Sequence, residues 1–338
     1  MPRILLTQAI HPQAERQLAM LGEVAVAADT DADTLRREAE GCDVIVVRAP
    51  LPEDIFTVAP SLTGAVRHGA GVDMIPIDKA TAHGVLVANV PGVNAVSVAE
   101  HVLLKLLQLA RRSAALDTTL RSAGWHAARA LADGGSELAG RTLGLIGYGH
   151  VGQAVARLCA RGLSMHVRAY TRRGLSADAP RWAEPAATLP ALLDGCDYLV
   201  LACPLTEHTR GLIGAPELAR LRRGACVVNV ARGPVIDTDA LVAALRSGHL
   251  GGAALDVFDS QPLPDGHPLW SMPDVLITPH VAGITDDSMR RMGEGAALAV
   301  ASLLRGELPP HCINPQALPA FLRRIGARKS VDSGQPWP

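Results

Sequence analysis

The chain has 338 residues, of which 48% are hydrophobic, and a formal net charge of −1 at pH 7. This length predicts about two domains. The charge gives no reason to expect a nucleic acid or an anionic membrane as a partner. No apolar run approaches the ~20 residues of a membrane-spanning helix. The N-terminal segment becomes polar too early for a signal peptide, and the six cysteines lack C-x-x-C spacing, so we expect a cytoplasmic protein with neither a metal site nor a disulfide framework.

The first part of the chain alternates between short apolar runs and helical patterns. Helical spacing predicts helices at 12–21 and 31–41. Runs of strand length, rich in Val, Ile and Leu, lie at 3–7, 24–27, 43–47, 64–68 and 85–89. Strands that alternate with helices predict a parallel sheet with crossover connections.

A second series of apolar runs begins near residue 141. Several of its members are apolar throughout, which is typical of strands whose two faces are both covered by helices. These runs lie at 141–147, 165–171, 197–203, 225–231, 251–257 and 274–280. Helical spacing also predicts helices at 96–112 and 286–305. We therefore predict an α/β fold of two doubly wound parallel-sheet units, and a loosely held tail after about residue 314, where prolines recur.

A glycine-rich sequence, Gly147-x-Gly149-x-x-Gly152, lies between a strand pattern and a helix pattern. Gly147 would permit a tight turn, Gly149 a close approach of the backbone to a pyrophosphate, and Gly152 close packing of the helix on the strand. The start of that helix would offer free N–H groups to phosphates. The alternative is a tight turn without a ligand, but the strand–turn–helix context favours a dinucleotide.

The strand after this helix ends in Thr171, Arg172 and Arg173, where an acidic residue would normally bind the ribose 2′-hydroxyl of NAD. Two guanidinium groups would instead bind a 2′-phosphate. We therefore expect NADP or NAD as the cofactor, with NADP favoured. The alternative is that both arginines are solvated loop charges.

Seven sequence blocks, taken in order, resemble the D-isomer-specific 2-hydroxyacid dehydrogenase family. They are RHGAGVD at 67, NVPGVNAVSVAEH at 89, GLIGYGHVG at 144, LACPLTEHTRGLI at 201, NVARGPVIDTDAL at 229, GGAALDVFDSQPLP at 251 and ITPHVAGIT at 277. The resemblance implies a flavodoxin-like substrate domain formed by 1–98 and 284–338, with a Rossmann NAD(P)-binding domain inserted at 99–283. It also implies an active cleft where the domains meet, a homodimer, and a small 2-oxo or 2-hydroxy acid as substrate, as in the glyoxylate/hydroxypyruvate reductases.

Three residues are the candidate catalytic groups. Arg232 follows a strand, at the edge where α/β sheets bind ligands, and its planar fork suits a carboxylate. Histidine in general titrates near neutral pH, so His280 could accept a proton in one direction of the reaction and return it in the other. The family resemblance places the catalytic arginine and the acid/base histidine at these two positions, and it places Gln261 where the family usually has a glutamate.

Gln261, in place of a glutamate, predicts a different pKa for His280. A glutamate beside His280 would stabilise the imidazolium and raise its pKa, whereas Gln261 can orient the ring but supplies no charge. We therefore expect His280 to titrate lower than in glutamate-bearing relatives, with activity extending to lower pH. Formate dehydrogenases of the same superfamily resemble this chain in pairing arginine and histidine with glutamine, and Asn94 resembles their substrate-facing asparagine.

Further site residues follow from position and resemblance. Backbone N–H groups of Ala70 and Gly71, in a glycine-rich loop after a strand, can bind an anion, and Arg48 could add a second cation; each has a plain structural alternative. The remaining cofactor contacts implied by the resemblance are His150, Val151, Cys203, Pro204, Thr209, Val230, Ala231, Asp256 and Gly283, with Asp256 expected to bind the nicotinamide amide. Two other functions stay open: a formate-dehydrogenase-like activity, and a non-catalytic NAD(P)-sensing protein similar to the corepressors of this superfamily.

Overall fold

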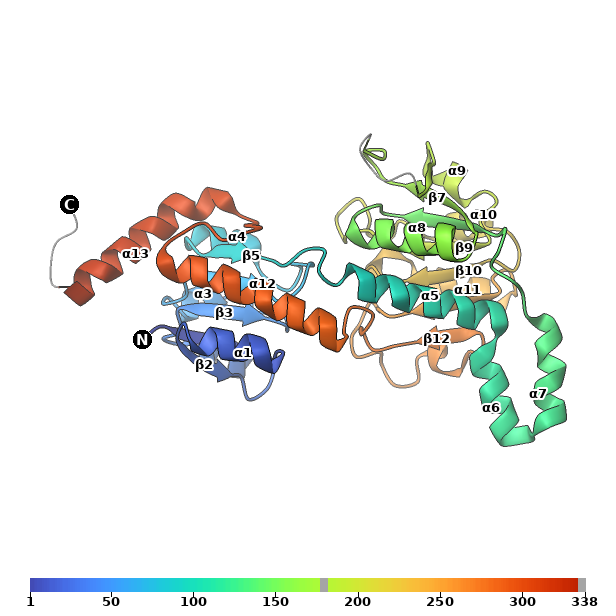
Figure 1. The fold of residues 1–338 in the computed structure, drawn as a ribbon, viewed down its shortest axis with the longest axis horizontal. Coiled ribbons are helices and arrows are strands. Elements are labelled where there is room, and N and C mark those ends of the chain that lie inside the picture. Colours follow the sequence, from blue (N-terminus) through green and yellow to red (C-terminus); the bar gives the residue numbers. More distant parts are fainter. Residues whose placement is uncertain (177–181, 334–338) are drawn as a thin grey trace. The chain divides into compact units, whose positions relative to one another are not determined.

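The computed structural model describes residues 1–176 and 182–333. The chain divides into two compact units (Figure 1). Unit 1 comprises Met1–Asn94 together with the chain from Thr285 onward, and unit 2 comprises Ala95–Ile284. Each unit is an α/β structure around its own parallel sheet, which confirms the predicted fold class. Each is described here by itself.

Unit 1 contains a five-stranded sheet in the order β2-β1-β3-β4-β5, with every neighbouring pair parallel. This is the flavodoxin-like order. The strands are β1 (Arg3–Leu6), β2 (Glu23–Val26), β3 (Val44–Val47), β4 (Gly64–Arg67) and β5 (Leu86–Ala88). The helices are α1 (Pro12–Ala19), α2 (Ala32–Ala39), α3 (Ile55–Val58), α4 (Ile77–Ala82), α12 (Asp286–Arg305) and α13 (Leu318–Ser333).

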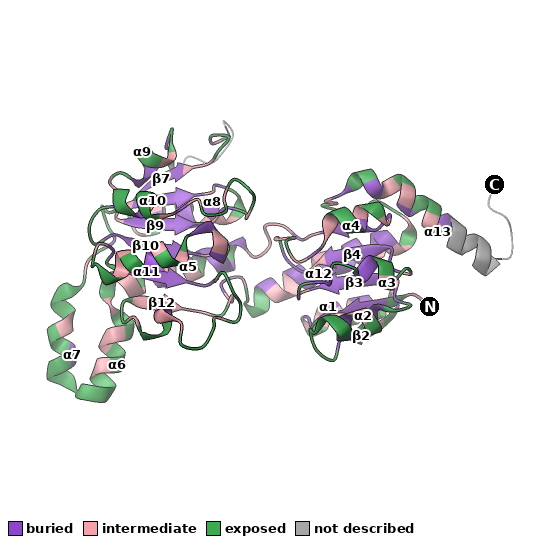
Figure 2. Ribbon diagram, turned by 180° about the vertical axis from the view of Figure 1, so that it is seen from behind, coloured by how far each residue is buried: buried purple, intermediate pink, exposed green. Residues whose placement is uncertain are grey.

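Alternate residues of the strands in unit 1 enter two different cores. Ile4 and Leu6 pack in the cluster that includes α1 and α12, whereas Leu5 packs with α2 and α3 on the other face. Figure 2 shows β3 and β4 buried between the helices, whereas the edge strand β2 is mostly exposed. Strand β3 is apolar throughout because helices cover both faces of the sheet.

Unit 2 contains a seven-stranded parallel sheet in the order β12-β11-β10-β9-β6-β7-β8. Its six strands from β8 to β11 follow the 3-2-1-4-5-6 order of a Rossmann fold. The strands are β6 (Thr142–Ile146), β7 (His166–Tyr170), β8 (Glu184–Pro185), β9 (Tyr198–Leu201), β10 (Cys226–Asn229), β11 (Gly252–Leu255) and β12 (Val275–Ile277). The helices are α5 (Ala95–Arg111), α6 (Ser113–Ala123), α7 (Trp125–Leu131), α8 (His150–Gly162), α9 (Leu189–Leu193), α10 (Ala215–Arg220) and α11 (Thr238–Arg246).

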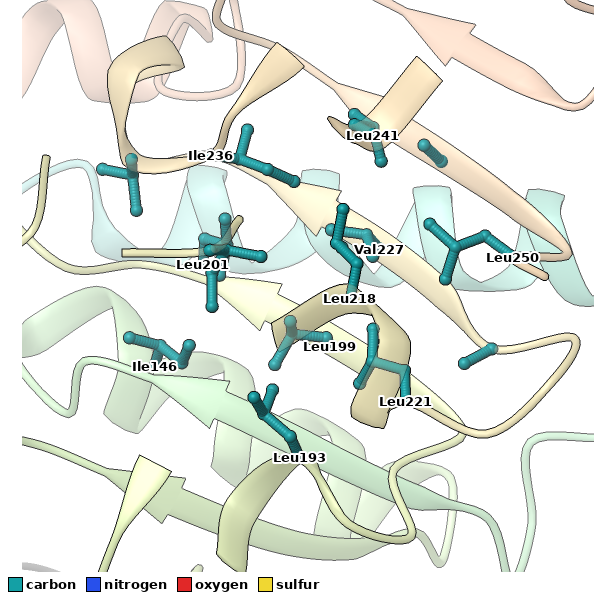
Figure 3. Close-up of a cluster of buried hydrophobic side chains, with 14 of the residues drawn as sticks. Ile146, Leu193, Leu199, Leu201, Leu218, Leu221, Val227, Ile236, Leu241 and Leu250 are labelled. Carbon is teal, nitrogen blue, oxygen red and sulfur yellow. The ribbon is translucent and has the colours of Figure 1, made fainter. Parts of the chain in front are cut away.

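Two cores sandwich the sheet of unit 2. On one face Leu199, Leu201 and Val227 pack against α9, α10 and α11, as Figure 3 shows. On the other face Val200 and Val228 pack against α5 and α8. All eleven strand positions expected from the sequence are strands. Only the two-residue β8 was not predicted.

The expectation of a loosely held tail after about residue 314 is wrong for the described part of the chain. The Asn314 side chain is fully buried and accepts a hydrogen bond from Val87 N (2.8 Å), while its amide donates to Val85 O (2.9 Å). Phe321 of α13 is also fully buried in the core of unit 1. These contacts fix the segment against β5, and residues 334–338 lie outside the described residues.

No helix within the described residues is both long and apolar enough to cross a membrane.

Candidate active site

The glycine loop joins β6 to α8, at the point where the strand order of unit 2 reverses. Gly147 has φ +97°, and a Cβ there would lie 2.7 Å from Ala202 O. A Cβ on Gly152 would lie 2.2 Å from Gly147 O, so only glycine allows α8 to approach the strand so closely. Among the described residues, its two chain neighbours apart, a Cβ on Gly149 would meet no atom within 4 Å. Gly149 therefore borders open space, which fits a bound pyrophosphate.

The first turn of α8 follows this loop. The backbone N–H groups of His150 and Val151 have no hydrogen-bond acceptor among the residues that the structure describes. Such N–H groups, together with the positive end of the helix dipole, favour an anion. The residues present thus fit a dinucleotide phosphate.

The loop after β7 carries the candidate 2′-phosphate cations. Thr171 Oγ1 donates a hydrogen bond to Gly174 O (2.6 Å), which closes the turn. Arg172 and Arg173 are both exposed in this turn. They are therefore available to solution, as a phosphate site requires.

The loop after β9 holds three of the expected cofactor contacts. Thr209 Oγ1 donates to Pro204 O (2.7 Å) and accepts from Thr206 N (2.7 Å), so this hydroxyl fixes the loop. Cys203 is buried, and burial raises the pKa of its thiol to about 11. A protonated thiol is a packing group rather than a nucleophile.

Arg232 lies in the turn after β10. Asn229, which is fully buried, accepts from Ala231 N (3.0 Å) and donates to Arg232 O (3.0 Å), so its side chain shapes the turn. Arg232 itself is half-buried and donates to Ala231 O (2.8 Å), and Val230 is half-buried before it. Asn229 was not predicted as a site residue, although a polar residue at the end of an apolar strand is the signal that could have identified it.

Asp256 lies after β11 and fixes the turn that carries His280. One carboxylate oxygen, Oδ1, accepts from Thr278 Oγ1 (2.7 Å) and Val281 N (2.9 Å), and Oδ2 accepts from Ala282 N (2.9 Å). A carboxylate offers about four acceptor positions. Three are used within unit 2, so the expected bond to the nicotinamide amide remains a prediction that would use the fourth.

His280 has φ +55°, a left-handed conformation. A residue other than glycine costs about 1–3 kcal/mol there and persists only where its surroundings impose it. The backbone N–H of His280 donates to Asp256 O (2.8 Å), and the next two N–H groups donate to the Asp256 carboxylate. This backbone strain is typical of a functional position. Gly283 follows in the same turn and is half-exposed.

The side chains of His280 and Gln261 contact each other. Gln261 Nε2 donates to Phe258 O (3.3 Å), which leaves Oε1 directed at His280 Nδ1 (3.0 Å). Since Oε1 only accepts, Nδ1 carries the hydrogen, and Nε2 is the basic nitrogen of the neutral ring. Gln261 can therefore orient the His280 ring for proton exchange at Nε2.

The four candidate substrate-binding residues belong to unit 1. Arg48 follows β3, and burial lowers its pKa. The carbonyl oxygens of Gly69, Ala70 and Gly71 accept from Val90 N, Asn89 Nδ2 and Arg67 Nε, respectively.

The carbonyl groups of this loop are thus hydrogen-bonded, whereas the N–H groups of Ala70 and Gly71 have no acceptor among the described residues. Free N–H groups of this kind are expected of an anion-binding loop. Asn94 is half-exposed in the turn before α5. Within the described ranges, no group of three or more His, Cys, Asp or Glu side chains could hold a metal ion.

Comparisons with known proteins identify the family of this chain. The NAD binding domain of the D-isomer specific 2-hydroxyacid dehydrogenases matches residues 103–282. The chain is 34% identical over 280 residues to a glyoxylate reductase of Korarchaeum cryptofilum, covering 82% of this chain and 84% of that protein. It is also 34% identical to a D-3-phosphoglycerate dehydrogenase of Mycobacterium tuberculosis, covering 93% of this chain but only 59% of that protein.

Two solved structures are similar over almost the whole chain. An NADPH-dependent glyoxylate/hydroxypyruvate reductase from Sinorhizobium meliloti, in complex with NADP and malonate, has a TM-score of 0.81 and 27% identity, covering 94% of this chain and 98% of that chain. An NAD-dependent formate dehydrogenase from Staphylococcus aureus, in complex with NAD, has a TM-score of 0.80 and 28% identity, covering 91% and 96%. The chain belongs to the D-isomer specific 2-hydroxyacid dehydrogenases and is an NAD(P)-dependent oxidoreductase of that family.

Proposed function

We propose that the enzyme reduces a small 2-oxo acid, such as glyoxylate or hydroxypyruvate, with NADPH, and oxidises the corresponding D-2-hydroxy acid in reverse. The observation that carries this proposal is the strained His280, whose Nδ1 donates to Gln261 and whose Nε2 is therefore the basic nitrogen. The glyoxylate reductase and the glyoxylate/hydroxypyruvate reductase among the similar proteins support the substrate class.

The catalytic roles follow from side-chain chemistry. When bound, the nicotinamide supplies or accepts the hydride. Nε2 of protonated His280 donates a proton to the oxygen of the 2-oxo group during reduction, and the neutral ring removes the hydroxyl proton during oxidation. The Arg232 guanidinium binds the substrate carboxylate with two parallel hydrogen bonds and stabilises negative charge on the reacting oxygen.

The same proposal assigns anion-binding roles in unit 1. The N–H groups of Ala70 and Gly71 donate to the substrate carboxylate, and Arg48 adds positive charge at the end of the neighbouring strand β3. Asn94 supplies an amide for the substrate. Support comes from the carbonyl groups of the loop, which are already hydrogen-bonded within unit 1.

The preference for NADP rests on Arg172 and Arg173. Both are exposed where the chain leaves β7, and the last residue of that strand, Tyr170, is followed by no acidic residue up to Ser176. An acid there would repel a 2′-phosphate, whereas charge-assisted bonds from guanidinium groups would hold it. The glycine loop, Cys203, Pro204, Thr209, Val230, Ala231, Asp256 and Gly283 complete the proposed cofactor site.

Formate oxidation is the second candidate, and Gln261 is the observation that favours it. Formate loses a hydride without losing a hydroxyl proton, so the reaction does not need a charged partner for His280. A glutamine at this position, which contacts His280 Nδ1 at 3.0 Å, suffices to orient the ring.

We further propose a homodimer formed through unit 2, in the cytoplasm. Helices α6 and α7 form a hairpin that extends from unit 2 (Figures 1 and 2), and α6 has no buried residue in the single chain. Leu104, Leu107, Leu120 and Trp125 are exposed on α5, α6 and α7, and an apolar surface of this kind favours burial by a second copy. The six cysteines are free thiols, which supports a reducing compartment. Light scattering would test the dimer by giving twice the chain mass of 35.4 kDa.

The experiment that tests the function is a spectrophotometric screen. The purified enzyme is mixed with NADPH or NADH and a panel of 2-oxo acids, and in parallel formate is supplied with NAD⁺ or NADP⁺. Turnover of glyoxylate or hydroxypyruvate with NADPH supports the proposal. Turnover of formate alone replaces it with the second candidate, and nucleotide binding without any turnover indicates a sensing protein.

A further inference from the structure

Helix α5 carries two basic residues, His101 and Lys105, of which His101 contacts Thr278 just before His280. His101 and Lys105 are four residues apart, and such residues share one face of a helix. Four residues further on, Leu109 lies beside Gly252 at the start of β11, where a Cβ on the glycine would be 3.0 Å from Leu109 Cδ2. The stripe formed by His101, Lys105 and Leu109 therefore follows β11 from its carboxyl end to its start, with Lys105 in the middle.

His101 is hydrogen-bonded to the Asp256 network. Its Nε2 lies 3.3 Å from Thr278 Oγ1 and 4.0 Å from Asp256 Oδ1. Since the Thr278 hydroxyl donates to Asp256 (2.7 Å), the same oxygen must accept from the Nε2–H of His101. His101 thus donates to Thr278 and Thr278 donates to Asp256, whose carboxylate also accepts from the N–H groups of Val281 and Ala282.

Lys105 is buried although no carboxylate lies within 4.0 Å of it among the described residues. Burial lowers the pKa of Lys105, and the nearby charge of Asp256 opposes that effect. Burial also lowers the pKa of His101. An apolar residue would usually be more stable in such an environment, so packing alone does not account for a lysine here.

We propose that His101 and Lys105 are positioning residues that hold the Asp256 carboxylate in place and thereby impose the left-handed backbone of His280. His101 donates to the Thr278 hydroxyl that binds Asp256, and the positive charge of Lys105 interacts with that carboxylate, while Asp256 anchors the two residues that follow His280. The inference rests on the proposed role of His280 in proton exchange.

The experiment compares Lys105→Met, which removes the charge at similar length, with Lys105→Arg, which keeps it. For Lys105→Met we expect kcat for 2-oxo acid reduction to fall about tenfold, the Kd of NADPH to stay within about twofold, and the melting temperature to be unchanged or higher. Amide hydrogen exchange at Val281 and Ala282 should become about tenfold faster, because their acceptor is no longer held. Lys105→Arg, which keeps the charge, should have the wild-type kcat and the wild-type exchange rates at Val281 and Ala282.

Two further variants complete the design. His101→Leu, which removes the donor to Thr278, should also speed exchange at Val281 and Ala282. Leu106→Met changes a fully buried side chain on the same helix without changing charge, so it should leave that exchange as in the wild type.

The inference is overturned if exchange at Val281 and Ala282 is unchanged in both Lys105→Met and His101→Leu. It is also overturned if Lys105→Met lowers kcat and the melting temperature together and Lys105→Arg restores neither, because lysine would then be a structural residue only. Amide exchange does not depend on turnover. A wild-type protein without activity would refute the proposed function, while the exchange data would still decide the positioning role.

Discussion

Replacing Gln261 with glutamate should raise the pKa of His280. In the structure Oε1 of Gln261 lies 3.0 Å from Nδ1, and a carboxylate oxygen at that place would put opposite charges about 4 Å apart. The attraction would be about 1 kcal/mol in water and about 4 kcal/mol at an effective dielectric constant of about 20. Gln261 is exposed and His280 half-exposed, so we expect a value near the lower limit, about one pKa unit.

The same rise in the pKa of His280 moves a different limb of the pH profile in each direction of the reaction. Reduction needs protonated His280 and declines as the pH rises through its pKa, so the alkaline limb of kcat/KM should move up by about one pH unit in Gln261→Glu. Oxidation needs the neutral ring, so its acidic limb should move up by a similar amount.

The assay is kcat/KM against pH in both directions for the wild type and Gln261→Glu. Ser260→Glu adds the same charge at the preceding exposed position, without the contact to His280, and is the matched control. Unchanged limbs in Gln261→Glu would refute the reasoning, as would an equal shift in the control.

Three other predictions follow from particular residues. Gly149→Ala should fold normally, because its Cβ would meet no atom of the described residues beyond its chain neighbours within 4 Å, but calorimetry should show NADPH binding about tenfold weaker or more. Gly152→Ala, whose Cβ would lie 2.2 Å from Gly147 O, should lose about 1–3 kcal/mol of stability in urea melts. Equal effects of the two variants on stability would contradict this. The double variant Arg172→Ala, Arg173→Ala should raise the KM of NADPH at least about tenfold and keep the KM of NADH within about twofold of the wild-type value. An equal rise in KM for both cofactors would refute the 2′-phosphate assignment. Burial, with the charges of Arg48 and Arg67, lowers the pKa of His68 to about 3. Between about pH 6.5 and 3 the unfolded chain therefore binds a proton that the folded chain does not, so the free energy of unfolding should decline as the pH falls through this range. His68→Leu should make this decline shallower in denaturant melts, and an unchanged decline would refute the assignment to His68.

The sequence predicted the strands well because helices cover both faces of each sheet. Runs such as 44–47 and 198–201 are therefore apolar throughout and recognisable without an alternating pattern. The expected helix at 286–305 has the same bounds in the structure, because Thr285 caps its start and Gly306, with φ +83°, ends it. The tail prediction failed because prolines suggested a loop, whereas the buried Phe321 stabilises a helix there through tertiary packing.

The site was only partly predictable. Arg232, His280 and Gln261 were located by motif order, and the Gln261 contact with His280 Nδ1 agrees with the expectation that the glutamine orients the ring. The supports of these residues depend on contacts between segments distant in sequence. Asn229 shapes the turn of Arg232, and Asp256 anchors residues 25 and 26 positions further along the chain. Spacing along the sequence does not reveal which N–H groups such side chains will meet.

Proton and hydride transfer to a 2-oxo acid can be tested by the rate of NADPH oxidation with glyoxylate, measured for the wild type, Arg232→Gln and His280→Gln. We predict turnover by the wild type and losses of about a hundredfold or more in both variants, which should still bind NADPH. A wild type that binds NADPH but reduces no 2-oxo acid, or variants that keep wild-type rates, would contradict the account.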